Sequence, residues 1–128
     1  MDVDKMRFSK EHEWVAAEGS DKMATVGITE YAAGELGDIV YIELPEEGTE
    51  VKFMEPMGTI EAVKTVADLY APISGAVKEV NKKLEDEPEL TNQSPYGEGW
   101  FIKVEMSDPS ELEKLMSHEE YQEMIGKE

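Results

Sequence analysis

The sequence contains no cysteine, only two histidines, and twelve basic residues against thirty acidic ones. Without cysteine the chain forms no disulfide, offers no thiol nucleophile and builds no thiolate metal site. The His-Glu-x-x-His zinc motif, a glycine-rich phosphate loop and the Gly-x-Ser-x-Gly nucleophile turn are all missing. We therefore expect a protein that holds no metal and is not an enzyme in its own right.

Long apolar stretches are also missing. No run is long enough to span a bilayer, and the first residues form neither an apolar signal segment nor an Arg-rich transit segment. We therefore expect a cytoplasmic, prokaryotic protein. The net charge of −18 repels nucleic acid and anionic membranes and favours basic partner surfaces, so we expect a protein that binds neither nucleic acid nor membranes. We also expect a monomer. A solubilising surface explains the same charge equally well.

The length of 128 residues predicts one domain over residues 1–128. Residues 1–10 are polar, and we expect a loose start. Residues 108–126 are expected to form C-terminal helices, because Asp108 and Pro109 suit a helix start and Ser117 with Glu120 forms a second capping box. Most of the chain between these ends consists of short runs of strand-forming residues.

A weak internal repeat suggests how these strands are arranged. Residues 37–42 resemble residues 75–80, and residues 58–63 resemble residues 99–104. Two similar β units packed face to face would form a flattened β-sandwich or barrel, so we expect a mainly β fold with short helices. Residues 38–44 are almost continuously apolar, which predicts partial burial on both faces of that strand.

The centre of the chain is a predicted hairpin. Residues 59–63 and 65–70 are both rich in strand formers, and Pro72 ends the pairing because it has no amide N–H. No Gly or Asn lies between the two runs, which favours a tight type I turn with Val63 and Lys64 at its tip. From position alone, Lys64 is either a solvated turn lysine, the simpler interpretation, or a lysine that a ligase acylates.

Several motifs together resemble the H-protein family of the glycine cleavage system. They cover nearly the whole chain in family order, and they are His-Glu-Trp at 12–14, Val-Gly-Ile-Thr at 26–29, Leu-Gly-Asp at 36–38, Glu-Ala-Val-Lys at 61–64, Asp-Leu-Tyr-Ala-Pro-Ile-Ser-Gly at 68–75 and Asn-Gln-Ser-Pro-Tyr-Gly-Glu-Gly-Trp at 92–100. The resemblance implies a non-catalytic lipoyl carrier with the biotinyl/lipoyl-type β fold.

The same resemblance implies the site and the partners. Lys64 would carry covalent lipoic acid, and Glu13 and Asp68 would hold the ammonium of the aminomethyl group that the arm receives from glycine. The implied partners are a pyridoxal-phosphate glycine decarboxylase, a tetrahydrofolate-dependent aminomethyltransferase, dihydrolipoamide dehydrogenase, and a lipoate ligase or lipoyl/octanoyl transferase. From the residues alone, Glu13 and Asp68 are equally well explained as surface carboxylates.

The sequence departs from the family at two positions near the tip. Ala62 stands where the family usually has Ser, and Ala67 where it often has Ser, so residues 61–65 approach the Glu-Ala-Met-Lys-Met pattern of biotin carriers. Val63 and Thr65 replace both methionines of that pattern. A biotin carrier, an unmodified β-rich binding module, and an H-like protein serving lipoate transfer or other sulfur metabolism therefore remain alternatives.

Overall fold

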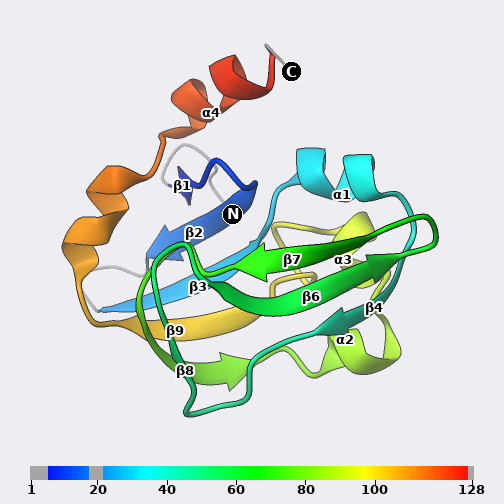
Figure 1. Cartoon of the computed structure of the whole chain (residues 1–128), viewed down its shortest axis with the longest axis horizontal. Helices are drawn as coiled ribbons and strands as arrows, with labels where there is room; N and C mark the ends of the chain where they lie inside the picture. Colours follow the sequence, from blue (N-terminus) through cyan, green and yellow to red (C-terminus); the bar gives the residue numbers. More distant parts are fainter. Residues whose placement is uncertain (1–5, 18–21, 127–128) are drawn as a thin grey trace.

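Two β-sheets packed against each other form the core of the protein, and short helices surround them (Figure 1). The computed structural model describes residues 6–17 and 22–126. In chain order the elements are β1 (Arg7–Phe8), β2 (Glu13–Ala17), β3 (Met23–Ile28), α1 (Glu30–Leu36), β4 (Ile39–Glu43), β5 (Glu50–Val51), β6 (Pro56–Ala62), β7 (Val66–Tyr70), β8 (Gly75–Val80), α2 (Lys83–Asp86), α3 (Leu90–Gln93), β9 (Ile102–Met106), the 3-10 helix η2 (Pro109–Lys114) and α4 (His118–Ile125).

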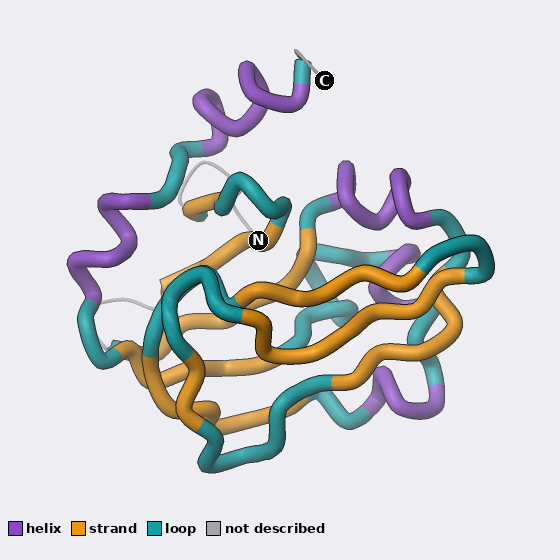
Figure 2. Tube along the Cα trace, in the orientation of Figure 1, coloured by secondary structure: helices purple, strands orange, loops and turns teal. Residues whose placement is uncertain are grey.

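The larger sheet has the strand order β1-β2-β3-β9-β8-β5, and the smaller sheet has the order β4-β6-β7. Figure 2 shows the smaller sheet lying across the larger one, with loops rather than long helices joining the strands. All strand pairs are antiparallel. The mainly β, two-layer fold predicted from the sequence is confirmed.

The internal repeat corresponds to equivalent strand pairs. The segments 37–42 and 58–63 contain β4 and β6, which pair with each other in the smaller sheet. The segments 75–80 and 99–104 contain β8 and β9, which pair in the larger sheet. The sheets differ in size because β1, β2 and β3 add to the edge of β9 and β5 adds to β8.

Apolar side chains from both sheets fill the space between them, and Ile60, Ile73 and Phe101 are among those that are fully buried. A second cluster contains Phe8 and Trp14. The expectation that residues 1–10 are loose is wrong for residues 6–10, because Phe8 exchanges two backbone hydrogen bonds of 2.8 Å with Met116. Residues 1–5 lie outside the described residues.

The helix ends largely follow the sequence signals. The Thr29 hydroxyl accepts a hydrogen bond from the Ala32 amide and begins α1, and Gly37 ends it with a positive φ of 78°. The predicted capping box of Ser117 and Glu120 begins α4. Asp108 and Pro109 begin a helix as predicted, and it is of the 3-10 type over residues 109–114. The stretch 81–99 contains α2 and α3, which have four residues each.

The strand β4 also departs from the prediction. Ile39 and Ile42 are buried, but Val40 and Tyr41 are exposed, so the strand is not partly buried on both faces as its apolar sequence suggested. The cause is an irregularity in the pairing with β6 between Ile39 and Tyr41, which changes the alternation of side chains. Within the described part of the chain, no helix is long and apolar enough to cross a membrane.

Candidate functional site

Lys64 lies at the tip of the β6–β7 hairpin, as predicted. Glu61 pairs with Val66, and the Ala62 amide donates a 2.8 Å hydrogen bond to the Thr65 carbonyl, which leaves Val63 and Lys64 as the two tip residues. The hairpin reaches one end of the long axis of the molecule (Figure 1). The Lys64 side chain is exposed. An amine in this position is accessible to a modifying enzyme.

The backbone below the tip is held in place. The Val63 amide donates a 3.1 Å hydrogen bond to the Asp38 carbonyl, just before β4, so the tip is tied to the neighbouring strand as well as to its own hairpin. Ala62 is 7% exposed and Ala67 is half-buried against the core. The two positions where the family often has Ser therefore pack toward the core, whereas Lys64 is exposed.

Glu13 has a buried side chain, although the sequence suggested a surface carboxylate as one interpretation. It is 1% exposed, at the first position of β2. The Ser9 hydroxyl donates a 2.6 Å hydrogen bond to Oε1, and the Tyr70 amide donates a longer one of 3.4 Å to Oε2. Burial raises the pKa of Glu13 from its ordinary value of 4.5 to about 8, while the hydrogen bonds from Ser9 and Tyr70 lower it and the nearby charge of Glu11 raises it further.

Asp68 is exposed on β7, opposite Thr59 of β6. Because Glu13 accepts from the backbone of Tyr70, the structure brings Glu13 to the same strand that carries Asp68. The two carboxyl groups nevertheless differ in their surroundings: one is buried and protonated near neutral pH, and the other faces solvent.

A long distance separates this pair from the tip. At about 3.3 Å per residue, Asp68 lies roughly 13 Å along the strand from Lys64, and Tyr70 roughly 20 Å. The lysine side chain has only four methylene groups and is shorter than this path. A group attached to Lys64 can reach Glu13 only if it extends the lysine by a long, flexible arm.

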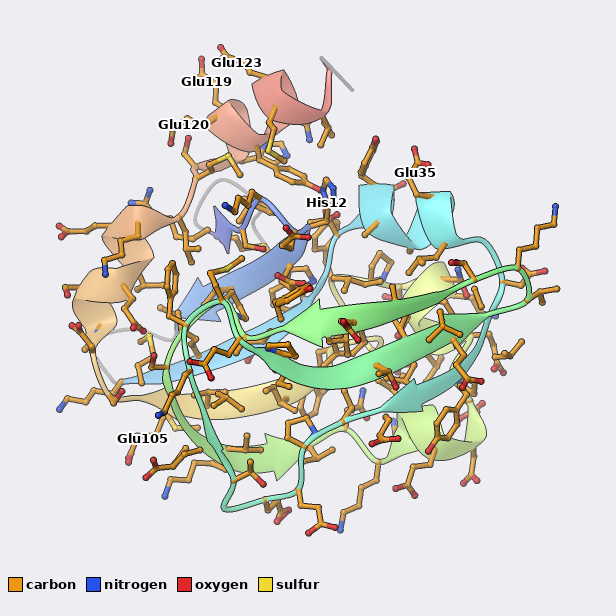
Figure 3. All side chains as sticks on the ribbon, viewed as in Figure 1. His12, Glu35, Glu105, Glu119, Glu120 and Glu123 are labelled. Atoms are coloured by element: carbon orange, nitrogen blue, oxygen red, sulfur yellow. The ribbon has the colours of Figure 1, made fainter. Side chains whose placement is uncertain are left out.

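The residues next to Glu13 take part in a hydrogen-bond network that was not predicted from the sequence. His12 has a positive φ of 73°, and its Nδ1 lies 2.8 Å from the Tyr121 hydroxyl, which in turn lies 2.7 Å from the Thr29 hydroxyl. Figure 3 shows His12 between α1 and α4. This network joins the start of β2 to both helices. His12 and Thr29 belong to the motifs at 12–14 and 26–29, but these motifs do not indicate the network, because its three members are far apart in the chain.

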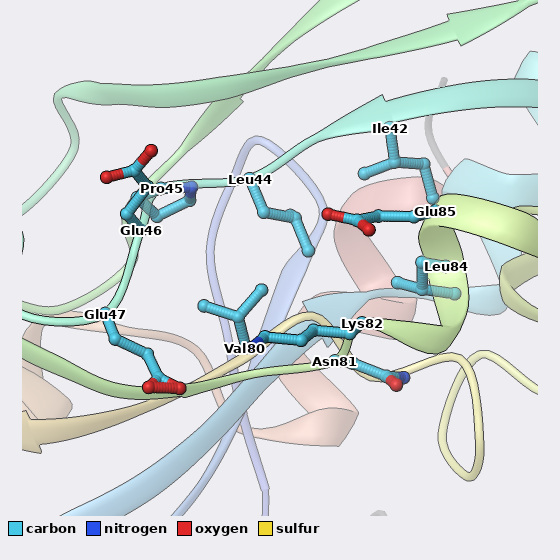
Figure 4. A pocket seen from close by; sticks show the side chains of 10 residues that line it. All are labelled: Ile42, Leu44, Pro45, Glu46, Glu47, Val80, Asn81, Lys82, Leu84 and Glu85. Atoms are coloured by element: carbon cyan, nitrogen blue, oxygen red, sulfur yellow. The ribbon is translucent and has the colours of Figure 1, made fainter.

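Other features of the described residues lie apart from this site. A cavity of about 350 Å³ opens between β4, β8 and α2 (Figure 4), and its lining residues are Ile42, Leu44, Pro45, Glu46, Glu47, Val80, Asn81, Lys82, Leu84 and Glu85. None of these is a predicted site residue. In residues 6–17 and 22–126, no cluster of three or more His, Cys, Asp or Glu side chains is arranged to hold a metal ion.

Comparison with known proteins gives the family. The family model described as "Glycine cleavage H-protein" matches residues 6–128. The chain belongs to the glycine cleavage H-protein family. It is 57% identical to the glycine cleavage system H protein of Staphylococcus saprophyticus subsp. saprophyticus over 122 residues, which is 95% of both chains. It is 53% identical to that of Staphylococcus carnosus over 123 residues, which is 96% of both.

A solved structure confirms the same fold. The crystal structure of a glycine cleavage system H protein from Mycobacterium marinum superimposes with a TM-score of 0.88 at 35% sequence identity, covering 98% of this chain and 99% of that one. The predicted function is therefore confirmed: this H protein is a non-catalytic carrier of the glycine cleavage system with a covalently attached lipoyl group. It interacts with the other components of that system.

The raised pKa of Glu13 predicts how stability depends on pH. The folded chain keeps the Glu13 proton up to about pH 8, whereas the unfolded chain loses it near 4.5. The unfolded state therefore binds fewer protons between these values, and the free energy of unfolding falls as the pH rises through that window. The difference between the two pKa values corresponds to roughly 5 kcal/mol.

We expect thermal melts of wild type and Glu13→Gln to show this effect. The melting temperature of wild type should fall, relative to that of the variant, between pH 5 and pH 8, because glutamine does not titrate. Circular dichroism at four pH values in this range is sufficient. Parallel curves for the two proteins would show that Glu13 ionises at its ordinary pKa.

Proposed function

We propose that Lys64 is the residue that carries the lipoyl group of this H protein. The observation that carries the proposal is the exposed position of Lys64 at a two-residue hairpin tip, held by hydrogen bonds on both sides. A ligase must surround one lysine and leave the others untouched, which a projecting and ordered tip permits. The inward positions of Ala62 and Ala67 leave that access open.

The other two proposed site residues lie on or beside β7, the strand that leads away from the hairpin tip. When attached, the lipoyl group supplies a redox-active dithiolane that carries the aminomethyl group of glycine. The exposed carboxylate of Asp68 lies part of the way along β7, and the buried carboxyl of Glu13 lies beyond it, beside Tyr70. We propose that Asp68 and Glu13 together hold the ammonium of the cargo.

Glu13 would act as a proton-linked partner for that ammonium. In the absence of a cation the buried carboxyl is protonated at neutral pH, because its pKa lies near 8. A neighbouring cation favours the ionised form, so binding the ammonium would release the Glu13 proton to solvent. The resulting charge-assisted hydrogen bond keeps the amine protonated, and a protonated amine has no lone pair with which to expel the sulfur. Ser9, which donates to Oε1, would hold the carboxylate in position.

The proposal extends to the individual partners and the location. We propose that the chain exchanges its cargo with a pyridoxal-phosphate glycine decarboxylase and a tetrahydrofolate-dependent aminomethyltransferase, and that dihydrolipoamide dehydrogenase reoxidises it. A lipoate ligase or a lipoyl/octanoyl transferase would attach the arm. We place this cycle in the cytoplasm and treat the chain as a monomer with one domain over residues 1–128. The net charge of −18 supports basic docking faces on the partner enzymes.

Reconstitution tests this proposal. Lipoylated chain mixed with the three enzymes, glycine, tetrahydrofolate and NAD⁺ should form NADH, and omission of the chain should stop the reaction. At chain concentrations below saturation, the rate should fall when the ionic strength rises from about 0.01 M to about 0.15 M, because salt screens attraction between acidic and basic faces. Absence of NADH formation from lipoylated chain would contradict the proposed cycle. A rate independent of salt would assign the charge to solubility alone.

A further inference from the structure

Large apolar side chains that are exposed to solvent gather beside Lys64. Among the described residues, the ones with the largest exposure are Val40, Tyr41, Val63 and Val66, which are 52%, 48%, 68% and 64% exposed. We call these four residues the tip patch. Val63 and Val66 belong to the hairpin, whereas Val40 and Tyr41 come from the neighbouring strand β4.

A β-bulge places the β4 part of the tip patch. Ile39 pairs with Ala62 and Tyr41 pairs with Glu61, so Val40 has no partner of its own on β6. In a regular strand, alternate side chains would point to opposite faces. Here the extra residue leaves Ile39 and Ile42 buried and turns two consecutive apolar side chains to solvent.

The pairing register shows how closely these side chains approach the tip. Tyr41, Glu61 and Val66 are directly opposite one another across β4, β6 and β7. One position closer to the tip, Ile39 pairs with Ala62. Beyond it, the Val63 amide donates a hydrogen bond to the Asp38 carbonyl. The tip patch therefore flanks Glu61 of β6, with its β4 residues on one side and its hairpin residues on the other, and Lys64 follows Val63 at the tip.

Acidic side chains border the tip patch. Glu61 lies between Tyr41 and Val66, and the next row on the same face of the sheet, two residues further from the tip, contains Glu43, Thr59 and Asp68. Both end residues of that row are exposed carboxylates. A partner that covers this surface would need an apolar centre and basic side chains around it.

We propose that the tip patch is the docking surface for the enzyme that acylates Lys64, and that β4 takes part in this recognition as well as the hairpin. The inference rests on the proposed function of Lys64. The catalytic groups of the acylating enzyme must come within bonding distance of an amine on four methylene groups. Such an enzyme has to cover the residues that surround Lys64.

Enzymes that act after acylation do not share this constraint. The arm separates the reacting sulfur atoms from the tip, so their active sites can work at a distance from β4. The tip patch is thus needed at one step, the attachment of the arm. Burial of the tip patch against an apolar surface of the enzyme then contributes to affinity.

The test compares wild type with variants of the tip patch as substrates of a lipoate ligase. Unmodified chains are incubated with the ligase, ATP and lipoate, and mass spectrometry measures the rate of acylation over a range of chain concentrations. The double variant Val40→Thr, Tyr41→Thr keeps strand-forming residues and leaves the hairpin unchanged. We expect its KM to rise about tenfold or more, with kcat within about twofold of wild type, because the lost contacts contribute to docking and not to the reacting amine.

Two further variants provide the controls. Val80→Thr makes the same change on β8, in the other sheet, and should leave KM within about twofold of wild type. Val66→Thr makes the same change on the hairpin side of the tip patch, and this single substitution should also raise KM. It preserves the test if circular dichroism shows that the double variant does not fold. With lipoylated chains, the KM for dihydrolipoamide dehydrogenase should not change in any of them.

The outcomes separate this inference from the function on which it rests. Failure of wild type to be acylated at Lys64 would contradict the proposed function itself. Acylation of wild type and both patch variants with the same KM would overturn the docking inference alone. An equal rise in KM for dihydrolipoamide dehydrogenase would show that the tip patch is not specific to acylation. A wild-type dimer that dissociates in the double variant would assign the surface to a second copy of the chain.

Discussion

Lys64→Arg is expected to abolish lipoylation and, as a result, all turnover of glycine in the reconstituted system. Arginine keeps the positive charge at the tip, but its guanidinium is not an acylable amine. Since Lys64 is exposed at the hairpin tip, the melting temperature should stay within a degree or two of wild type. Intact mass after incubation with lipoate ligase measures the loss directly.

The matched control is Lys78→Arg, at an exposed lysine on β8. This variant should accept one lipoyl group and support glycine turnover at the wild-type rate. Lipoyl label on a different lysine of the Lys64→Arg chain would contradict the assignment of the site.

The second large effect concerns the cargo. In aminomethyl-loaded protein, the double variant Glu13→Gln, Asp68→Asn should release ammonia at least about tenfold faster than wild type, because a lost charge-assisted hydrogen bond contributes about 1.5–3 kcal/mol. Both replacements keep the shape of the side chain and remove its charge. Lipoylation at Lys64 should still occur, since Lys64 and the hairpin tip are unchanged.

The pH dependence of ammonia release tests whether Glu13 must lose a proton to hold the cargo ammonium. We call Glu13 and Asp68, acting together on that ammonium, the clamp. Glu13 must lose its proton to hold a cation, and its pKa near 8 makes that easier as the pH rises. The ratio of ammonia release from Glu13→Gln to that from wild type should therefore grow between pH 6.5 and pH 8. Glu43→Gln, an exposed carboxylate of the same sheet, serves as the control and should match wild type. A double variant that holds its cargo as long as wild type would show that these carboxylates are not the clamp.

Local sequence patterns predicted the elements that depend on neighbouring residues. The hairpin around Lys64 followed from two runs of strand formers, and the start of α4 from its capping box. The internal repeat correctly predicted two equivalent strand pairs. The hairpin and the helix start depend on residues that are only a few positions apart. The two strand pairs could be predicted because the same sequence pattern occurs twice in the chain.

Features that depend on distant residues could not be predicted in this way. Glu13 is buried because Ser9 and the Tyr70 amide close around it, and the latter lies 57 residues away. The exposure of Val40 and Tyr41 results from a bulge in their pairing with β6, which an apolar run does not show. The order of residues 6–10 arises from pairing with Met116 at the far end of the chain.

The mass of the protein isolated from its natural host, with a peptide map of the segment around Lys64, tests the central claim most directly. The account predicts one lipoyl group on each chain, attached through an amide to the Lys64 side chain, and no other modification. A biotinyl group at Lys64, a lipoyl group on another lysine, or an unmodified chain from cells that lipoylate their other carriers would contradict it.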